Sequence, residues 1–179
     1  LGYERRLSKK WTAGIGYEFR TRAFNPKFED RDRDGHSVLA RAKYRAARKV
    51  TLHSKLAYGT FDSNIGDRAG VRIDRSFEQL RFSPGVRVGL GKWRLGLRLD
   101  YRRREFSTSE VQDRSRHNRV DDLFGVRLDA RRKLPVKGLE LKGFLGWQRN
   151  DASPDDPTIP SDDTGYDEFV AGIGLKFTF

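Results

Sequence analysis

The chain has 179 residues, no cysteine and a formal net charge of +12, with 36% hydrophobic and 35% charged residues. This length fits one domain, so residues 1–179 are predicted to form a single unit. No stretch approaches the roughly 20 consecutive apolar residues that a membrane-spanning helix needs. The lack of cysteine excludes disulfides and thiolate metal sites. A membrane location is therefore open to this sequence only if strands do the crossing, as a closed β-barrel.

Apolar and polar residues alternate with a period of two in eight segments, which predicts eight β-strands. The clearest segment sets Trp93, Leu97 and Tyr101 on one face against Arg94 and Arg98 on the other. The eight segments span residues 11–20, 38–45, 50–59, 80–90, 93–102, 124–131, 139–148 and 169–179. Each segment has one apolar face and one face of small or charged residues.

Short connections alternate with long ones between these segments. The short ones span residues 46–49, 91–92 and 132–138, and the long polar ones about 24–37, 61–76, 106–121 and 150–167. This asymmetry is typical of outer-membrane barrels, which have short periplasmic turns and long external loops. Trp11 and Trp93 near the short turns, with Tyr101 and Trp147 towards the long loops, predict aromatic girdles at two interfaces. A bulge is expected at Pro84, because proline cannot donate a ladder hydrogen bond.

The predicted fold is all-β: an antiparallel up-and-down transmembrane β-barrel of at least eight strands, with short periplasmic turns and long external loops. A soluble lipocalin-like barrel is the structural alternative, and it would bury the apolar faces and expose the arginines. Alternation alone fits both orientations. The loop asymmetry, the aromatic positions and the C-terminal residues favour the membrane, so we expect the chain in a bacterial outer membrane.

The C-terminal segment, residues 166–179, ends in Phe179 and places Phe177, Leu175, Ile173 and Ala171 at alternate positions before it. This pattern resembles the C-terminal strand of bacterial outer-membrane β-barrel proteins, where a terminal Phe is read by the barrel assembly machinery. The resemblance implies that Phe179 and Phe177 form an assembly signal. It also implies that this machinery, outer-membrane lipid and lipopolysaccharide are partners.

The whole layout is similar to eight-stranded barrels of the OmpA and OmpX type. The repeated hairpins also resemble the barrel ends of larger exporters that carry tetratricopeptide repeats, including the surface lipoprotein assembly modifier (Slam) group. Residues 1–10 are interpreted as a strand end and a periplasmic turn. That interpretation favours the C-terminal part of a larger barrel.

The polar faces of the predicted strands collect basic residues. Eight of them are predicted to line an anion path: Arg20, Arg41, Lys55, Arg87, Arg98, Arg127, Lys142 and Lys176. The clear acids on the same faces are Glu18, Asp100, Asp129 and Glu140. We therefore predict an electropositive pore or export-channel domain for anionic solutes or polymers. The alternative is a closed barrel that is filled by an ion-pair network and acts through its external loops.

The acids of the long loops are interpreted mainly as solvated charge. One cluster is more specific, because Asp30, Asp32 and Asp34 before Gly35 repeat the opening of a calcium-binding loop. A calcium site is therefore a hypothesis for the first long loop. Its twelfth position, however, is Arg41, where a bidentate Glu is required.

Catalysis has little support, and the chain is predicted not to be an enzyme. His36, His53 and His117 are the only histidines, and no Ser/His/Asp set can be placed by spacing. Nucleic acid is not an expected partner, because the arginines occupy one face of each strand and the opposite faces are apolar.

Overall fold

A computed structural model describes residues 1–23, 32–63, 66–68, 71–108, 116–136, 138–153 and 165–178. The strands are β1 (Gly2–Arg6), β2 (Trp11–Arg22), β3 (Arg33–Ala47), β4 (Val50–Ser63), β5 (Gly66–Arg68), β6 (Val71–Ile73), β7 (Phe77–Leu90), β8 (Trp93–Phe106), β9 (Val120–Lys133), β10 (Leu139–Ser153) and β11 (Tyr166–Phe177). No helix occurs in these ranges. The predicted all-β, antiparallel, up-and-down architecture is confirmed.

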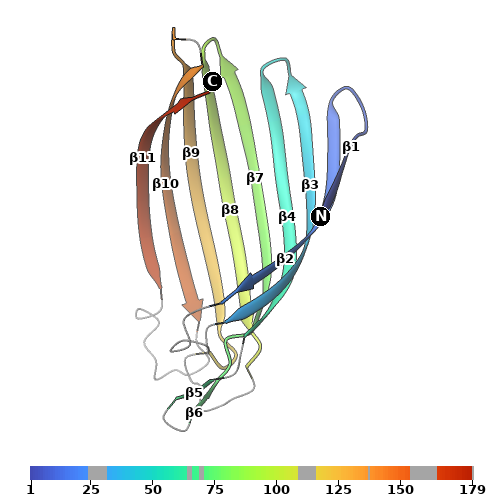
Figure 1. Cartoon of the computed structure of the whole chain (residues 1–179), viewed down its shortest axis with the longest axis vertical. Helices are drawn as coiled ribbons and strands as arrows, with labels where there is room; N and C mark the ends of the chain where they lie inside the picture. The colour runs from blue at the N-terminus through green and yellow to red at the C-terminus, as the bar shows by residue number, and fades with distance from the viewer. Residues whose placement is uncertain are drawn as a thin grey trace.

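Nine of the strands form one curved sheet in the order β1-β2-β3-β4-β7-β8-β9-β10-β11 (Figure 1). Every neighbouring pair is antiparallel. Seven of the eight predicted segments lie entirely in a strand of this sheet, and the eighth lies in β11 as far as Phe177. The ninth strand, β1, was not predicted from the periodicity. The sheet is not closed, since β1 and β11 are not paired with each other. A separate hairpin of β5 and β6 lies at the end away from the short turns (Figure 1).

The strands are longer than the periodic segments suggested, so the long connections are shorter than expected. For example, β8 and β10 extend to Phe106 and Ser153, and β3 begins at Arg33. At the opposite end the hairpins are tight. Gly91 has a φ of 61°, which a glycine adopts without steric cost, and this allows the chain to reverse between β7 and β8.

One register runs across the whole sheet and assigns every side chain to a face. A single row of register partners contains Trp11, Tyr44, Leu52, Val86, Leu97, Leu128, Leu145 and Ala171. The row beside it, shifted by one residue, contains Thr12, Lys43, His53, Gly85, Arg98, Arg127, Gly146 and Val170. Successive side chains of a strand point to opposite faces. We call the face of the first row the outer face and that of the second row the inner face.

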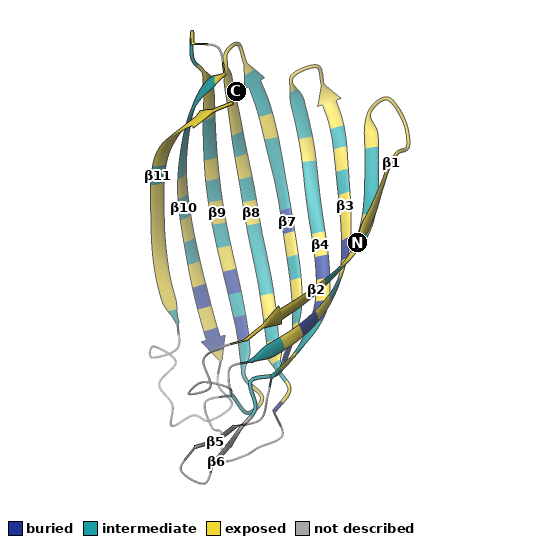
Figure 2. Cartoon of the chain, in the orientation of Figure 1, coloured by how far each residue is buried: buried dark blue, intermediate teal, exposed yellow. Residues whose placement is uncertain are grey.

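The apolar outer face of this sheet is the more exposed one, whereas in a water-soluble protein the apolar face is usually buried. Outer apolar side chains are open to the surroundings, with Ile15 68% and Ile173 82% exposed. The buried apolar residues of the described chain, among them Leu39, Ala57 and Leu123, all lie on the inner face. Figure 2 shows the resulting alternation of exposed and less exposed positions along the central strands. The inner face is therefore the concave side of the sheet, where side chains crowd one another.

The bulge expected at Pro84 is wrong. Phe82 pairs with Tyr101 and Gly85 with Arg98, so the register between β7 and β8 is the same on both sides of the proline. Two pairs are missing from that ladder because Pro84 has no N–H to donate. The irregularity in register lies instead between β3 and β4, at residues 45–47.

Close approach of β3 and β4 gives a stability prediction. A Cβ at Gly59 would overlap with the carbonyl oxygen of His36 and with Ser37 Oγ, whereas a Cβ at Gly89 would lie 3.7 Å from the nearest atom, on Lys49. Gly59→Ala should lower the free energy of unfolding by about 1–3 kcal/mol, because the backbone must shift. Gly89→Ala should change it by less than about 0.5 kcal/mol. Urea unfolding of both variants tests this, and equal effects would contradict the packing.

Candidate functional site on the basic inner face

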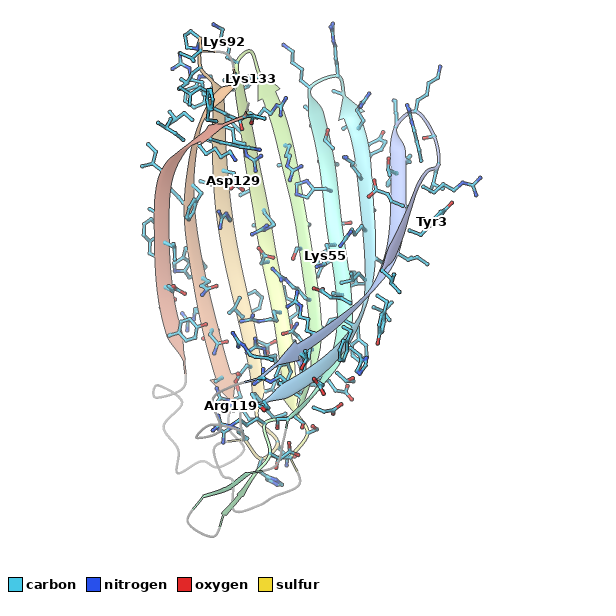
Figure 3. All side chains as sticks on the ribbon, in the orientation of Figure 1. Tyr3, Lys55, Lys92, Arg119, Asp129 and Lys133 are labelled. Carbon is cyan, nitrogen blue, oxygen red and sulfur yellow. The ribbon has the colours of Figure 1, made fainter. Side chains whose placement is uncertain are left out.

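The inner face is the candidate functional site because it collects the basic side chains of eight strands. The register places all eight predicted residues on it, one from each of β2, β3, β4, β7, β8, β9, β10 and β11: Arg20, Arg41, Lys55, Arg87, Arg98, Arg127, Lys142 and Lys176. They do not form one ring. Arg41 is the register partner of Lys55, and Arg98 is that of Arg127. Figure 3 shows Lys55 midway between the two ends of the sheet.

Asp100 is the centre of a hydrogen-bond network on this face and accepts three side-chain hydrogen bonds. Its Oδ1 accepts hydrogen bonds from Arg81 Nη2 at 3.0 Å and from Ser83 Oγ at 2.5 Å, and its Oδ2 accepts one from Arg98 Nε at 2.7 Å. The Asp100 side chain is only 16% exposed. One carboxylate therefore holds two arginines from neighbouring strands, and Arg98 has a structural partner as well as a place on the predicted anion path.

Two further residues of the predicted path are also paired. Arg127 contacts Asp129, with 3.3 Å between Nε and Oδ1, and its guanidinium lies 4.1 Å from the centre of the Phe144 ring. Arg20 contacts Glu18, with 2.7 Å between Nη2 and Oε1. The Arg20 side chain is 64% exposed, so that second pair contributes little to stability.

The remaining five residues of the predicted path make no ion pair within the described residues: Arg41, Lys55, Arg87, Lys142 and Lys176. Arg41 and Lys55 sit opposite each other, an arrangement that destabilises a strand pair. They line a hollow of about 200 Å³ together with Lys43 and Glu4. A second hollow of about 330 Å³ lies beside Arg98 and Arg127. The unpaired cations are therefore the part of this face that is free to meet an anion.

A cluster of aromatic residues covers the inner face at the end away from the short turns, and the sequence analysis missed it. The rings of Phe61 and Phe77 are stacked, with 4.8 Å between their centres, and Phe106 lies 5.7 Å from Phe77. Phe77 is only 4% exposed. These side chains come from β4, β7 and β8, so the cluster spans three neighbouring strands.

Arginines surround this aromatic cluster. Arg33 and Arg104 place their guanidinium carbons 4.9 and 5.1 Å from the centre of the Phe77 ring. Arg119 lies 5.5 Å from the Phe106 ring and is held by Asp121, with 2.6 Å between Nε and Oδ1. Cation–π contacts of this kind fix the guanidinium groups in place. One signal was present in the sequence: the phenylalanines fall out of phase with the apolar set of their own strands, which assigns them to the opposite face.

Several predicted site residues cannot be placed in a site. Phe177 lies on the outer face opposite Leu139, but Phe179 is outside the described residues. Asp30 is also outside them, whereas Asp34 pairs in register with Asp62. Within the ranges that the structure describes, no group of three or more His, Asp or Glu side chains could hold a metal ion. The calcium hypothesis therefore stays a prediction.

Comparison with known proteins finds no matching family model, no similar curated protein and no similar solved structure. The described residues contain no helix that is long and apolar enough to cross a membrane. What the fold defines is a class: an antiparallel, up-and-down, all-β sheet with an exposed apolar face and a basic inner face.

The Asp100 network gives a prediction about the inner face. Asp100→Asn removes the charge that holds Arg81 and Arg98, and it should lower the free energy of unfolding by about 1–3 kcal/mol. Glu18→Gln is the matched control, because its pair with Arg20 is exposed and should be worth less than about 1 kcal/mol. Denaturant unfolding under identical conditions measures both. A smaller loss for Asp100→Asn than for Glu18→Gln would contradict the assigned network.

Proposed function

We propose that the chain is the membrane-spanning part of an outer-membrane β-barrel, and that its basic inner face lines a passage for anionic solutes or polymers. The observation that carries the proposal is the register. Across the middle of the sheet it gathers most of the large apolar side chains on the exposed outer face and most of the lysines and arginines on the inner face. Water is a poor solvent for such an outer face, and the acyl chains of a bilayer are a good one.

Aromatic side chains at the two ends of the outer face support a bilayer environment. The rings of Trp11 and Tyr44 are tilted against each other with 4.6 Å between their centres, and the Arg132 guanidinium lies 5.1 Å from the Trp93 ring, both near the short turns. Towards the other end, Tyr101 donates a hydrogen bond to Asp122 Oδ1 at 2.7 Å. Side chains that are apolar on one side and polar at the tip suit the two interfaces of a bilayer.

The proposal requires the sheet edges to be paired in the membrane, because an unpaired backbone group in lipid costs several kcal/mol. The nine strands alternate in direction, so β1 and β11 run the same way. Direct pairing of these two edges would be parallel. One intervening antiparallel strand would preserve the alternation of the sheet.

The anion preference rests on the unpaired cations. Arg41 and Lys55 face each other without a carboxylate partner in the described chain, and fixed positive charge in a confined space concentrates anions. The second candidate function is a closed barrel that acts through its external loops. It is favoured by the Asp100 network and by the Phe77 cluster, which fill part of the inner face.

The orientation of the faces can be tested at two adjacent residues of β8. Leu97→Cys lies on the outer face, so after reconstitution in vesicles it should react with a maleimide confined to the lipid phase. Arg98→Cys lies on the inner face and should react only with a water-soluble reagent, because successive residues of a strand point to opposite sides. Comparing the labelled fraction of the two variants tests the assignment. The reverse pattern would mean that the basic face meets lipid.

The passage itself can be tested by planar-bilayer recording under a salt gradient. The reversal potential should indicate anion preference, and Lys55→Glu should reduce the anion-to-cation permeability ratio by about twofold or more at 0.1 M salt, where screening is weak. Arg149→Glu, on the outer face, is the matched control and should leave the ratio unchanged. If verified, folded protein shows no conductance, the channel proposal fails and the closed barrel is supported.

A further inference from the structure

The outer face carries a shallow apolar groove near the short turns. It has a volume of about 420 Å³ and is lined by Trp11, Tyr44, Leu52, Pro84, Val86 and Leu97. The groove exists because Ala42, Ser54 and Pro84 are consecutive register partners on β3, β4 and β7. These small side chains form a low row between rows of larger ones. The groove is apolar, as a hydrocarbon chain requires.

Each hairpin that contributes to this groove ends in basic residues. Lys9 lies between β1 and β2, Arg48 and Lys49 between β3 and β4, and Lys92 between β7 and β8, and all four are exposed. Figure 3 shows Lys92 at this end of the sheet. Leu52 follows Lys49 by three residues, which is about 10 Å along a strand. The basic turns therefore lie within a few residues of the apolar groove, at the end of the sheet next to it.

These turn cations are not neutralised by the protein. Within the described part of the chain, no ion pair involves any of the four side chains. The outer face differs at its other end, where Arg103 pairs with Glu105 and Arg149 with Asp151. Positive charge without a partner is thus a property of the short-turn end of the sheet, where the exposed apolar groove lies.

Lys49 and Lys92 belong to the inner side of that end, because Lys49 Cβ would lie 3.7 Å from a Cβ on inner-face Gly89 and Lys92 directly precedes outer-face Trp93. Lys9 and Arg48, at the hairpin tips, are therefore the cations available to the outer face.

We propose that this groove and its turns form a docking site for an anionic phospholipid of the phosphatidylglycerol type. One acyl chain lies in the groove over Leu52 and Ser54, Trp11 and Tyr44 mark the level of the glycerol backbone, and the phosphate meets Lys9 and Arg48 at the hairpin tips. The charge of the turns selects the anionic headgroup, and the apolar groove is continuous with the outer face. The inference rests on the proposed membrane function.

Tryptophan quenching by brominated lipid tests the site, because Trp11 lines the groove and Trp147 lies away from it. The full chain is reconstituted in phosphatidylcholine vesicles that contain a small fraction of phosphatidylglycerol or phosphatidylcholine with brominated acyl chains. Two variants report separately: Trp93→Phe with Trp147→Phe leaves Trp11, and Trp11→Phe with Trp93→Phe leaves Trp147. Trp11 should be quenched by brominated phosphatidylglycerol with about threefold or more higher apparent affinity than by brominated phosphatidylcholine. Trp147 should not distinguish the two lipids.

Three changes should remove the preference at Trp11. Lys9→Gln with Arg48→Gln removes the cations that meet the headgroup, Ser54→Leu fills the groove while those cations remain, and 0.5 M salt screens the attraction. Arg103→Gln with Arg149→Gln is the matched charge control and should leave the preference intact.

The outcomes separate this site from the proposed membrane function. Equal quenching of Trp11 by both lipids would overturn the site while leaving the membrane proposal in place. Quenching of Trp147 with none at Trp11 would also overturn it, because the groove would then be covered by protein. If neither lipid quenches either tryptophan, the chain is not in the bilayer, and both proposals fail.

Discussion

Backbone hydrogen bonding between neighbouring strands holds this sheet in one register from β2 to β11. In that register a row such as Tyr44, Leu52 and Val86 stays on one face across successive strands, and the adjacent row stays on the other. A slip of one residue in any strand would turn its arginines outward and its leucines inward. The exposed apolar surface, the basic inner face and the position of the groove all follow from this constraint.

Charge on the inner face opposes stability, and the protein offsets only part of it. Asp100 forms ion pairs with two arginines from adjacent strands, and Asp129 forms one with Arg127. Arg41 and Lys55 are left opposite each other. Strand pairs with opposed cations are less stable than alternatives with a carboxylate, so this arrangement is the part of the face that folding alone does not explain. A bound or passing anion would stabilise this part of the inner face most.

Basic side chains have different contacts at the two ends of the sheet. At one end arginines stack on Phe77 and Phe106 inside the curve, and those of the outer face pair with acids. At the other end the turn lysines and arginines extend from exposed hairpins without such partners among the described residues. This polarity gives the sheet a direction along its strands, as expected for a protein whose two ends meet different surroundings.

The strand class and the composition of each face could be predicted from the sequence alone, because a period of two is a local property that needs no knowledge of neighbouring strands. The sequence also located the short turns, such as that at Gly91. Three features became known from the three-dimensional structure: Asp100 holds Arg81 as well as Arg98, Phe77 stacks with Phe61, and β1 and β11 are unpaired with each other. Contacts between neighbouring strands, such as those of Arg81 and Phe61, depend on register and curvature. The bulge expected at Pro84 failed for the same reason, since its neighbours kept their pairing.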